Sequence, residues 1–279
     1  MESFLLENAH LRMRVAPQGG ALLSLFSLRH QLPVLREASG EQPGECALFP
    51  MLPLANRVAG NRFAFAGRDV ALPQHQADEH FFLHGDGWLK RWEAISVTRD
   101  ACTLQLRSKM SCGYDYLATL CYRLTEGALD VTLTLTHQGA KPMLYGCGFH
   151  PWFYFDRQCR VQFYASGCWP EGESHLPRDW QANLPDGADF SCMQYGRDEW
   201  LNLGYSGWNG CAVIENGVMN ITLLAQTPWL MLFRMPGSSF LCLEPQTHPV
   251  NAHNMAGQPG LQVLGAGDSL HFSMQIRVL

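Results

Sequence analysis

Alternation of apolar and polar residues is the feature of this sequence that most restricts its fold. Residues 129–136 read Leu-Asp-Val-Thr-Leu-Thr-Leu-Thr, and residues 270–278 alternate in the same way. Because successive side chains of a β-strand point to opposite faces, this two-residue period predicts strands that are buried on one side. Residues 102–107 and 116–124 predict two more strands, and Thr125-Glu126-Gly127 supplies the turn after the second.

Turn signals and the lack of helical patterns point the same way. Asn216-Gly217 separates residues 212–215 from residues 218–224, and Asn-Gly is a strong hairpin signal. No window carries a sustained helical stripe with capping residues, whereas 26 glycines and 16 prolines interrupt the chain at short intervals. Many short strands with turns are typical of an all-β sandwich or barrel. The 279 residues, 47% of them hydrophobic, suffice for one large domain or two smaller ones.

Two segments lack the alternation. Residues 39–45 are polar and contain Gly and Pro, as expected of a loop. Residues 167–210 are weakly periodic and rich in Trp, Pro, Asp and Gly. Long irregular segments in compact domains are usually functional, so we expect this one to be a structured excursion that covers a site.

Charge and cysteine usage exclude several classes of partner. The net charge is −5 and no basic run exceeds Lys90-Arg91, so we expect no nucleic-acid partner. No apolar stretch approaches the roughly 20 residues of a membrane helix, and the run that stops at Glu7 predicts no secretion signal. Ten cysteines occur singly without a Cys-x-x-Cys pair, which indicates a reducing compartment. We therefore expect a cytoplasmic protein without a membrane partner.

His150 is the first candidate for chemistry. It lies in residues 148–155, Gly-Phe-His-Pro-Trp-Phe-Tyr-Phe, where the following proline restricts its backbone to extended conformations. A histidine on stiff backbone among aromatic side chains suits proton transfer beside a ring-shaped substrate, because imidazole titrates near neutral pH. A buried histidine in an aromatic core explains the same pattern equally well.

Glu244 is the second candidate. It ends the apolar run that starts at Phe240 and is followed at once by Pro245. Cys242 and Glu244 share one face of the predicted strand. A carboxylate on a half-buried face is costly unless it is hydrogen-bonded or its pKa moves, and both outcomes suit a general base. We expect Glu244 to be ionised at neutral pH.

Two further segments offer groups that could bind a ligand. Asn56-Arg57 follows a proline-stiffened apolar stretch, and amide and guanidinium groups suit hydroxyls or carboxylates. An arginine at a strand edge would explain it as well. In residues 81–92, His84 precedes a glycine turn and Trp88 adds a flat apolar surface for a sugar. A tight turn with core tryptophans is the structural alternative.

Other catalytic patterns are missing from the sequence. No Gly-x-Ser-x-Gly or glycine-rich phosphate loop is present, and the histidines do not match the spacing of known metal sites. We therefore expect no metal and no cofactor. The four segments bring one glutamate and the loop residue Asp86, whereas glycosidases need two carboxylates flanking the bond. One acid and one base fit proton transfer better than glycoside cleavage. The histidines weighed as metal ligands are His75, His80, His84, His248 and His253.

In this order, the four segments resemble the aldose 1-epimerase (galactose mutarotase-like) family. Asn56-Arg57 is similar to the family's Asn-Arg, and residues 83–92 are similar to its Leu-His-Gly followed by Gly-Phe and a Trp. Residues 148–153 are similar to Gly-x-His-Pro-Tyr-Phe, and residues 243–252 to the Glu-Pro-Gln segment. The resemblance continues to Gly265-Ala266-Gly267-Asp268, which is similar to the turn before the last strand.

This resemblance implies a single large antiparallel β-sandwich over residues 1–279, with an open concave site and neither metal nor cofactor. It implies that His150 is the general acid for the ring oxygen and Glu244 the base for the anomeric hydroxyl of a monosaccharide. The residues expected to bind that sugar are Asn56, Arg57, His84, Trp88 and Asn209.

Two positions depart from the family pattern. Asn209 stands where the family has an Asp-His segment whose Asp binds a sugar hydroxyl, and Met231 stands where it often has a Gln. Both changes fall on hydroxyl recognition and leave the sugar open. The favoured function is interconversion of the α and β anomers of a free aldose. The alternatives are a non-catalytic carbohydrate-binding protein and an epimerase for a hexose phosphate, which would use Arg62, Arg68 or Arg91.

Overall fold

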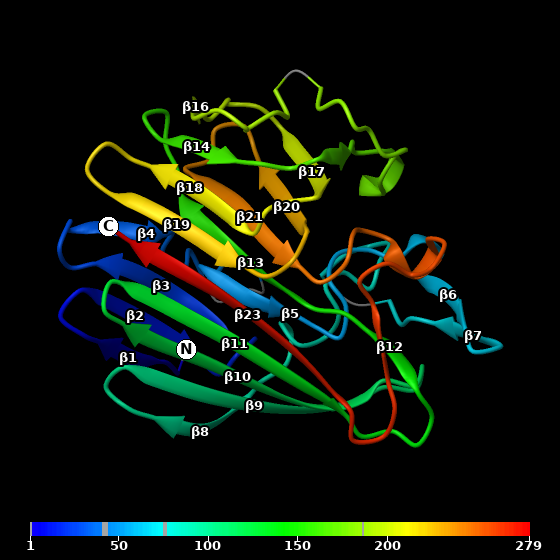
Figure 1. Cartoon of the computed structure of the whole chain (residues 1–279). Coiled ribbons are helices and arrows are strands. Elements are labelled where there is room, and N and C mark those ends of the chain that lie inside the picture. Colours follow the sequence, from blue (N-terminus) through cyan, green and yellow to red (C-terminus); the bar gives the residue numbers. More distant parts are fainter. Residues whose placement is uncertain (1, 41–43, 75–76, 186) are drawn as a thin grey trace.

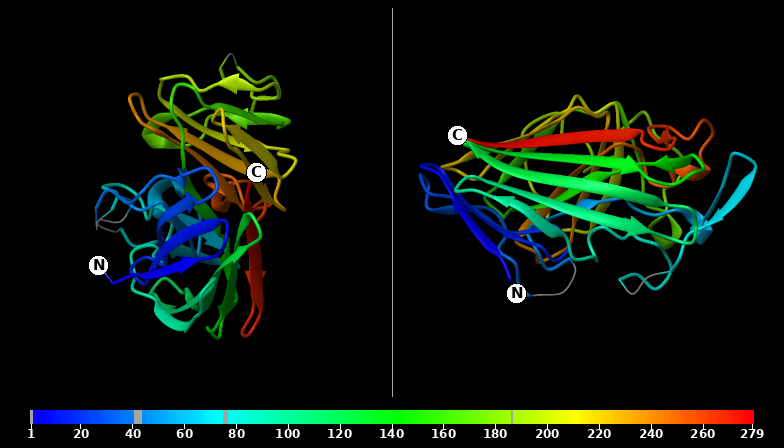
Figure 2. Two further views of the ribbon diagram at one scale, coloured as in Figure 1. Left: turned by 90° about the vertical axis from the view of Figure 1, so that its left-hand side faces the viewer. Right: turned by 90° about the horizontal axis from the view of Figure 1, so that it is seen from below.

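Two large antiparallel sheets packed face to face make up most of the protein (Figure 1). The computed structural model describes residues 2–40, 44–74, 77–185 and 187–279. In the left view of Figure 2, the blue strands of the first sheet and the red strand of the second lie in separate layers. This arrangement confirms the expected all-β class.

The first sheet has ten strands. They are Phe4–Glu7 (β1), Leu11–Ala16 (β2), Ala21–Ser27 (β3), Leu32–Leu35 (β4), Leu48–Met51 (β5), Gly148–Tyr154 (β13), Gly167–Trp169 (β15), Leu201–Ser206 (β17), Trp229–Arg234 (β20) and Phe240–Gln246 (β21). Their spatial order is β1-β2-β3-β4-β13-β21-β20-β17-β15, and β5 pairs with both β13 and β3. Strands far apart in sequence therefore become neighbours at the centre of this sheet.

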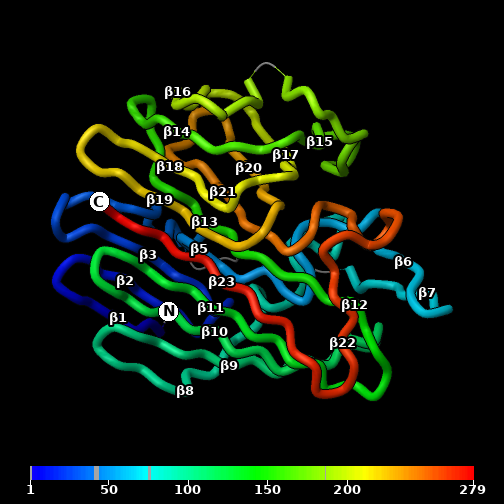
Figure 3. The backbone as a smooth tube through the Cα atoms, viewed as in Figure 1, coloured from blue at the N-terminus to red at the C-terminus, as the bar shows by residue number. Residues whose placement is uncertain are grey.

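The second sheet has nine strands. They are Glu93–Val97 (β8), Ala101–Lys109 (β9), Asp115–Thr125 (β10), Ala128–His137 (β11), Arg160–Phe163 (β14), Gln194–Tyr195 (β16), Cys211–Glu215 (β18), Asn220–Ala225 (β19) and Ser269–Val278 (β23). Their order is β16-β14-β18-β19-β23-β11-β10-β9-β8, so the red strand β23 runs between yellow β19 and green β11 (Figure 3).

Short elements complete the chain. Two small two-stranded sheets pair Arg62–Phe65 (β6) with Arg68–Ala71 (β7) and Met143–Tyr145 (β12) with Gln262–Leu264 (β22). The helices of the described residues are single 3-10 turns at Ala59–Asn61 (η1), Glu173–His175 (η2) and Ala252–Asn254 (η3). None of these helices is long and apolar enough to cross a membrane. All ten cysteines are free.

The space between the sheets holds the main core. Phe149 on β13 stacks on Phe272 of β23, with ring centroids 5.4 Å apart. Along β11 buried and less buried residues alternate, as the sequence predicts. Fully burying one such apolar side chain contributes roughly 1.5–3 kcal/mol. A second apolar cluster lies on the opposite face of the first sheet and includes Phe49, Trp88 and Trp152. The first sheet is therefore covered on both faces.

The four long alternating strands are confirmed as β9, β10, β11 and β23. The hairpin around Asn216-Gly217 is confirmed, but its second strand begins at Asn220, two residues later than expected. Residues 216–219 form a four-residue loop because the Asn216 side-chain oxygen accepts a hydrogen bond from the Met219 N–H, while Val218 is exposed. That residues 1–279 form one domain stays a prediction.

Candidate functional site

A transverse row of side chains crosses the middle of the first sheet and forms the floor of the site. His150 on β13 pairs with Phe49 on β5, and the register of β13 with β21 places Glu244 on its other side. Glu244 pairs with Met231 on β20, which in turn pairs with Gly204 on β17. Antiparallel register therefore brings together residues from four distant parts of the sequence.

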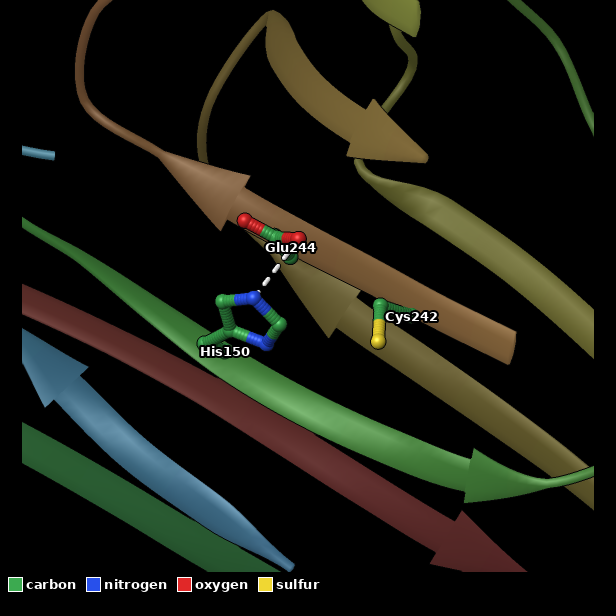
Figure 4. Close-up of side chains that lie close together, drawn as sticks. All are labelled: His150, Cys242 and Glu244. Atoms are coloured by element: carbon green, nitrogen blue, oxygen red, sulfur yellow. Dashed lines mark ion pairs between the residues drawn. The ribbon is translucent and has the colours of Figure 1, made fainter. Parts of the chain in front are cut away.

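His150 and Glu244 are in direct contact. The distance between His150 Nε2 and Glu244 Oε1 is 3.1 Å, and both side chains are buried. Figure 4 shows the imidazole on β13 and the carboxyl group on β21 turned toward one another. Cys242, two residues before Glu244, points to the same side of β21, as the strand period predicts. The geometry is that of an acid and a base within hydrogen-bond reach.

Burial shifts both groups of this pair. It raises the pKa of Glu244 to about 8, against the opposing effects of the hydrogen bond from Gln246 and the charge of Arg57. It lowers the pKa of His150 to about 3, helped by the positive charges of Arg36 and Arg57. At neutral pH the pair therefore keeps one proton, held by Glu244, and His150 is neutral. This differs from the expected ionised Glu244, because the strand centre is more enclosed than a half-exposed face.

Flat side chains fix the plane of the His150 ring. Trp152, two residues along the same face, stacks on it at a centroid distance of 4.0 Å, and Phe49 lies 4.8 Å away. The guanidinium group of Arg36 lies over the Trp152 ring, 4.1 Å from its centroid. The neighbouring aromatic Phe149 instead faces the inter-sheet core. The His150 ring is thus held by Trp152 from its own strand, β13, and by Phe49 from the neighbouring strand β5.

His84 is oriented by a reciprocal backbone contact with Asn56. The His84 N–H donates to the Asn56 carbonyl, and the Asn56 N–H donates to His84 Nδ1 at 3.0 Å. Because Nδ1 accepts, the ring proton of neutral His84 lies on Nε2. Gly85 makes this approach feasible, since its φ is +71° and a Cβ there would lie 2.1 Å from the Leu52 carbonyl oxygen. The His84 ring packs edge-on against His150, with ring centroids 5.3 Å apart.

Arg57 lines the same pocket and brings a cationic group to it. Its Nη1 donates to Asn56 Oδ1 at 3.3 Å, and its Nη2 lies 3.6 Å from Asp78 Oδ2. Burial lowers its pKa, although Asp78 and Glu244 counteract this. Nε of Arg57 is buried with no hydrogen-bond partner among the described residues. An unused donor beside the acid–base pair suits a ligand oxygen.

Trp88 does not line the pocket, and its expected role in sugar binding stays a prediction. Its indole N–H donates to the carbonyls of Leu83 and Gly85, and its ring stacks on Phe49 at 4.7 Å. It therefore packs behind His84 and shapes the turn. Asp86 is likewise structural, since its carboxylate accepts hydrogen bonds from the hydroxyls of Ser108 and Tyr116.

The pocket above the acid–base pair has a volume of about 200 Å³. Its walls combine sequence-predicted residues with others that the sequence analysis missed. The lining residues are Asn56, Arg57, Leu83, His84, His150, His175, Trp200, Asn202, Met231, Phe233 and Glu244. His175, Trp200 and Asn202 belong to residues 167–210, so that segment covers the site as expected.

Asn209 does not line this pocket either, and its expected role in sugar binding stays a prediction. It is exposed in the turn between β17 and β18, where its side-chain oxygen accepts a hydrogen bond from the Cys211 N–H. The residue that reaches the pocket from this part of the chain is Asn202 on β17. The turn after β17 carries Asn209 to an exposed position beyond that strand. Met231 does line the pocket.

Three potential metal ligands lie close together at the floor. One ligand atom each of His150, Cys242 and Glu244 lies within 4.8 Å of the others (Figure 4). The thiolate is the form of cysteine that binds metals, and burial raises the pKa of the Cys242 thiol well above its usual range. His248 accepts from the Ala55 N–H and contacts the Pro249 carbonyl, so it is structural. His75 lies outside the described residues.

The family of the protein follows from comparison with known sequences. A family model described as aldose 1-epimerase matches residues 2–277. The chain belongs to the aldose 1-epimerase family. It is 34% identical over 293 residues to the uncharacterized protein YphB of Escherichia coli, covering 100% of this chain and 99% of that protein.

Solved structures agree with this aldose 1-epimerase assignment. A protein of Escherichia coli K12 that is 32% identical superposes with a TM-score of 0.95 over 100% of this chain and 99% of its own. A GalM/aldose epimerase homologue from C. elegans has 16% identity and a TM-score of 0.83, covering 100% and 99% of the two chains. A galactose mutarotase-like protein from Clostridium acetobutylicum has 16% identity and a TM-score of 0.84, covering 99% and 94%. The last two matches show the fold alone.

Proposed function

We propose that this protein interconverts the α and β anomers of a free aldose. The observation that carries the proposal is the 3.1 Å contact between His150 Nε2 and Glu244 Oε1 at the floor of a pocket large enough for part of a monosaccharide. Membership of the aldose 1-epimerase family supports an isomerase acting on carbohydrates.

The reaction requires one proton to leave the sugar and another to arrive. Glu244 takes the proton of the C1 hydroxyl while His150 protonates the ring oxygen, so the bond between C1 and the ring oxygen breaks and an aldehyde forms. After rotation about the C1–C2 bond, the ring closes on the other face and the two residues reverse their roles. Each positioned acid or base typically contributes roughly a hundred- to ten-thousand-fold.

The shared proton of the pair suits this sequence of steps. A protonated Glu244 beside neutral His150 carries the same number of protons as an ionised Glu244 beside imidazolium. Because His150 Nε2 and Glu244 Oε1 lie 3.1 Å apart, a proton can pass from the carboxyl group to the imidazole as the sugar reacts, without exchange with solvent. The donors of Arg57 and the Nε2–H of His84 support binding of the sugar oxygens, and orientation by such groups lowers the barrier further.

The test is exchange NMR or polarimetry on a panel of hexoses and pentoses. We expect at least one sugar to equilibrate much faster than in buffer. If no sugar is accelerated but one binds, the protein is a carbohydrate-binding protein and the proposal fails. The hexose phosphate alternative has less support, because Arg62, Arg68 and Arg91 do not line the pocket and pair with Asp69, the Pro142 carbonyl and Glu2 respectively.

We also propose that the protein works in the cytoplasm. All ten cysteines are free, and several, such as Cys147 and Cys242, are fully buried in the cores. Unpaired thiols at this number are typical of proteins from reducing compartments.

A further inference from the structure

A cluster of side chains around Glu171 forms the wall of the pocket that faces the acid–base pair. Glu171 follows β15 and His175 ends η2, whereas Trp200 directly precedes β17 and Asn202 is the second residue of that strand. His175, Trp200 and Asn202 line the same pocket as Glu244. Here we call these four residues the Glu171 wall. None of them belongs to the segments that carry the family resemblance.

The carboxylate of Glu171 holds the other three side chains by hydrogen bonds. Its Oε1 accepts from Asn202 Nδ2 at 2.5 Å and from His175 Nδ1, and its Oε2 accepts from Trp200 Nε1 at 2.6 Å. Burial alone would raise the pKa of Glu171, but these hydrogen bonds bring it below the usual value. The group is therefore a carboxylate at neutral pH, and both of its oxygens are engaged.

These contacts determine which atoms the wall offers to a ligand. Because Asn202 gives its amide N–H to Glu171, its Oδ1 is the end that can accept a hydrogen bond. In neutral His175, an N–H at Nδ1 that donates to Glu171 leaves Nε2 as an acceptor. Trp200 adds an indole face, which packs edge-on against Phe233 at 5.3 Å. The wall thus presents acceptors and an aromatic surface beside a negative charge.

The backbone that carries Glu171 and His175 is built as a closed arch. Glu171 bridges to Pro177, the Gly172 N–H donates to the Leu176 carbonyl, and the Arg178 N–H donates to the Pro170 carbonyl. His175 has a φ of +61°, a conformation that residues other than glycine rarely adopt. Such backbone angles persist only where the surroundings impose them, and here they direct the imidazole toward Glu171 and the pocket.

We propose that Glu171 is a positioning residue through which Asn202 and His175 select an uncharged monosaccharide. This inference rests on the proposed function. Sugar hydroxyls are hydrogen-bond donors that match the two acceptors of the wall. A phosphate or carboxylate substituent would instead meet acceptors and the Glu171 charge, and like charges in a partly desolvated site repel. Arg57, the cation of this pocket, already faces Asp78, Glu171 and Glu244.

The test compares Glu171→Gln and Glu171→Ala with Glu173→Gln. Glu173 is an exposed glutamate in the same arch and serves as the matched control. Exchange NMR gives kcat and KM for glucose, galactose, glucose 6-phosphate and glucuronate, and calorimetry gives the affinity for each. Thermal unfolding identifies variants that lose their fold. Glu171→Gln keeps the shape of the side chain, so it stays informative if Glu171→Ala is unstable.

We expect the wild-type protein to prefer a neutral hexose over both charged sugars by at least about tenfold in kcat/KM. In Glu171→Gln we expect KM for the neutral sugar to rise about five- to twentyfold, with kcat within threefold and weaker discrimination against the charged sugars. Glu173→Gln should match the wild type. If Glu171→Gln also matches it, or if the wild type accepts a charged sugar equally well, the inference is wrong while the epimerase function stands. If sugars bind without turnover, the proposed function fails. The ratio of calorimetric affinities for neutral and charged sugars, in the wild type and in Glu171→Gln, then tests the role of Glu171.

Discussion

The two sides of the pocket are built in different ways. The floor, with His150 and Glu244, lies on regular central strands that are buried on both faces. Three of the four residues of the Glu171 wall come from the irregular segment between β15 and β17, and the fourth, Asn202, lies on β17. Two of the four are more than 40% exposed, Trp200 at 44% and the side chain of His175 at 47%. Rigid strands hold groups that must meet reacting atoms, and loop-borne groups can vary with the ligand.

This difference separates two kinds of expected mutational effect. Changes on the floor alter proton transfer and hence kcat, because those groups act in the transition state. Changes in the wall alter KM and the choice of sugar. Each of the following experiments asks whether the two sides are as separate as their construction suggests.

The largest effect is expected for Glu244→Gln. The amide keeps the shape but cannot take a proton, so we expect kcat to fall by about a thousandfold or more, as measured by exchange NMR. The folded Glu244 carboxyl holds its proton up to a pKa of about 8, whereas the unfolded group releases it near 4.5. The contribution of the Glu244 carboxyl to folding stability therefore falls as the pH rises from 4.5 to about 8. Melting curves should show Glu244→Gln gaining stability over the wild type from pH 5 to 8, by about 3 kcal/mol at pH 7. Loss of folding would contradict a catalytic role.

The next effect concerns His150→Asn. Asparagine retains a polar group but has no titrating proton, so we expect kcat to fall by about a hundredfold or more with a modest change in binding. Trp152→Phe is the matched control, since it keeps an aromatic ring against position 150. Near-normal turnover of His150→Asn would assign the acid to another group and break the distinction between floor and wall.

The pH profile offers a third test. Above the raised pKa of Glu244, about 8, the pair loses its shared proton and the ring oxygen has no acid. We expect kcat to fall about tenfold per pH unit beyond that point. Below it, the low pKa of His150, about 3, keeps the second proton off, so activity should persist into mildly acidic solution. A profile that declines between pH 6 and 7 would show that the pair is solvated rather than buried.

The smallest effect separates two asparagines that lie seven positions apart. Asn202→Ala should raise KM about five- to tenfold because it removes an acceptor from the wall, whereas Asn209→Ala should change KM less than twofold because it faces solvent. Steady-state kinetics on one neutral sugar decides this. Equal effects of the two substitutions would restore Asn209 as a binding residue and contradict the structural assignment.

How far the sequence predicted the molecule depended on the range of the interactions involved. The alternation of residues 129–136 predicted β11 because a strand's period is local. The faces shared by Cys242 and Glu244 were predictable for the same reason. That His150 and Glu244 meet depends on pairing of strands about ninety residues apart, which the residues alone did not indicate and which the family resemblance supplied.

The wall could not be predicted from local patterns. Glu171, His175 and Asn202 are polar residues in a weakly periodic segment, where such residues are ordinarily solvated. Only hydrogen bonds spanning up to 31 positions bring them together. Similarly, Trp88 looked like a sugar platform because indole is flat, yet its N–H satisfies backbone carbonyls of its own turn. The signal that the sequence did offer was the expectation that residues 167–210 cover a site.

The position of β23 has a consequence for how the protein is made. Strands β11 and β19 lie on either side of it, with ladders that pair residues 128–136 and 221–225 to residues 269–278. While the ribosome is still adding the residues before Ser269, both neighbours present open edges that can pair with other chains. The second sheet closes only when Ser269–Val278 inserts between them. Nascent chains stalled before that point should therefore be the species that chaperones retain.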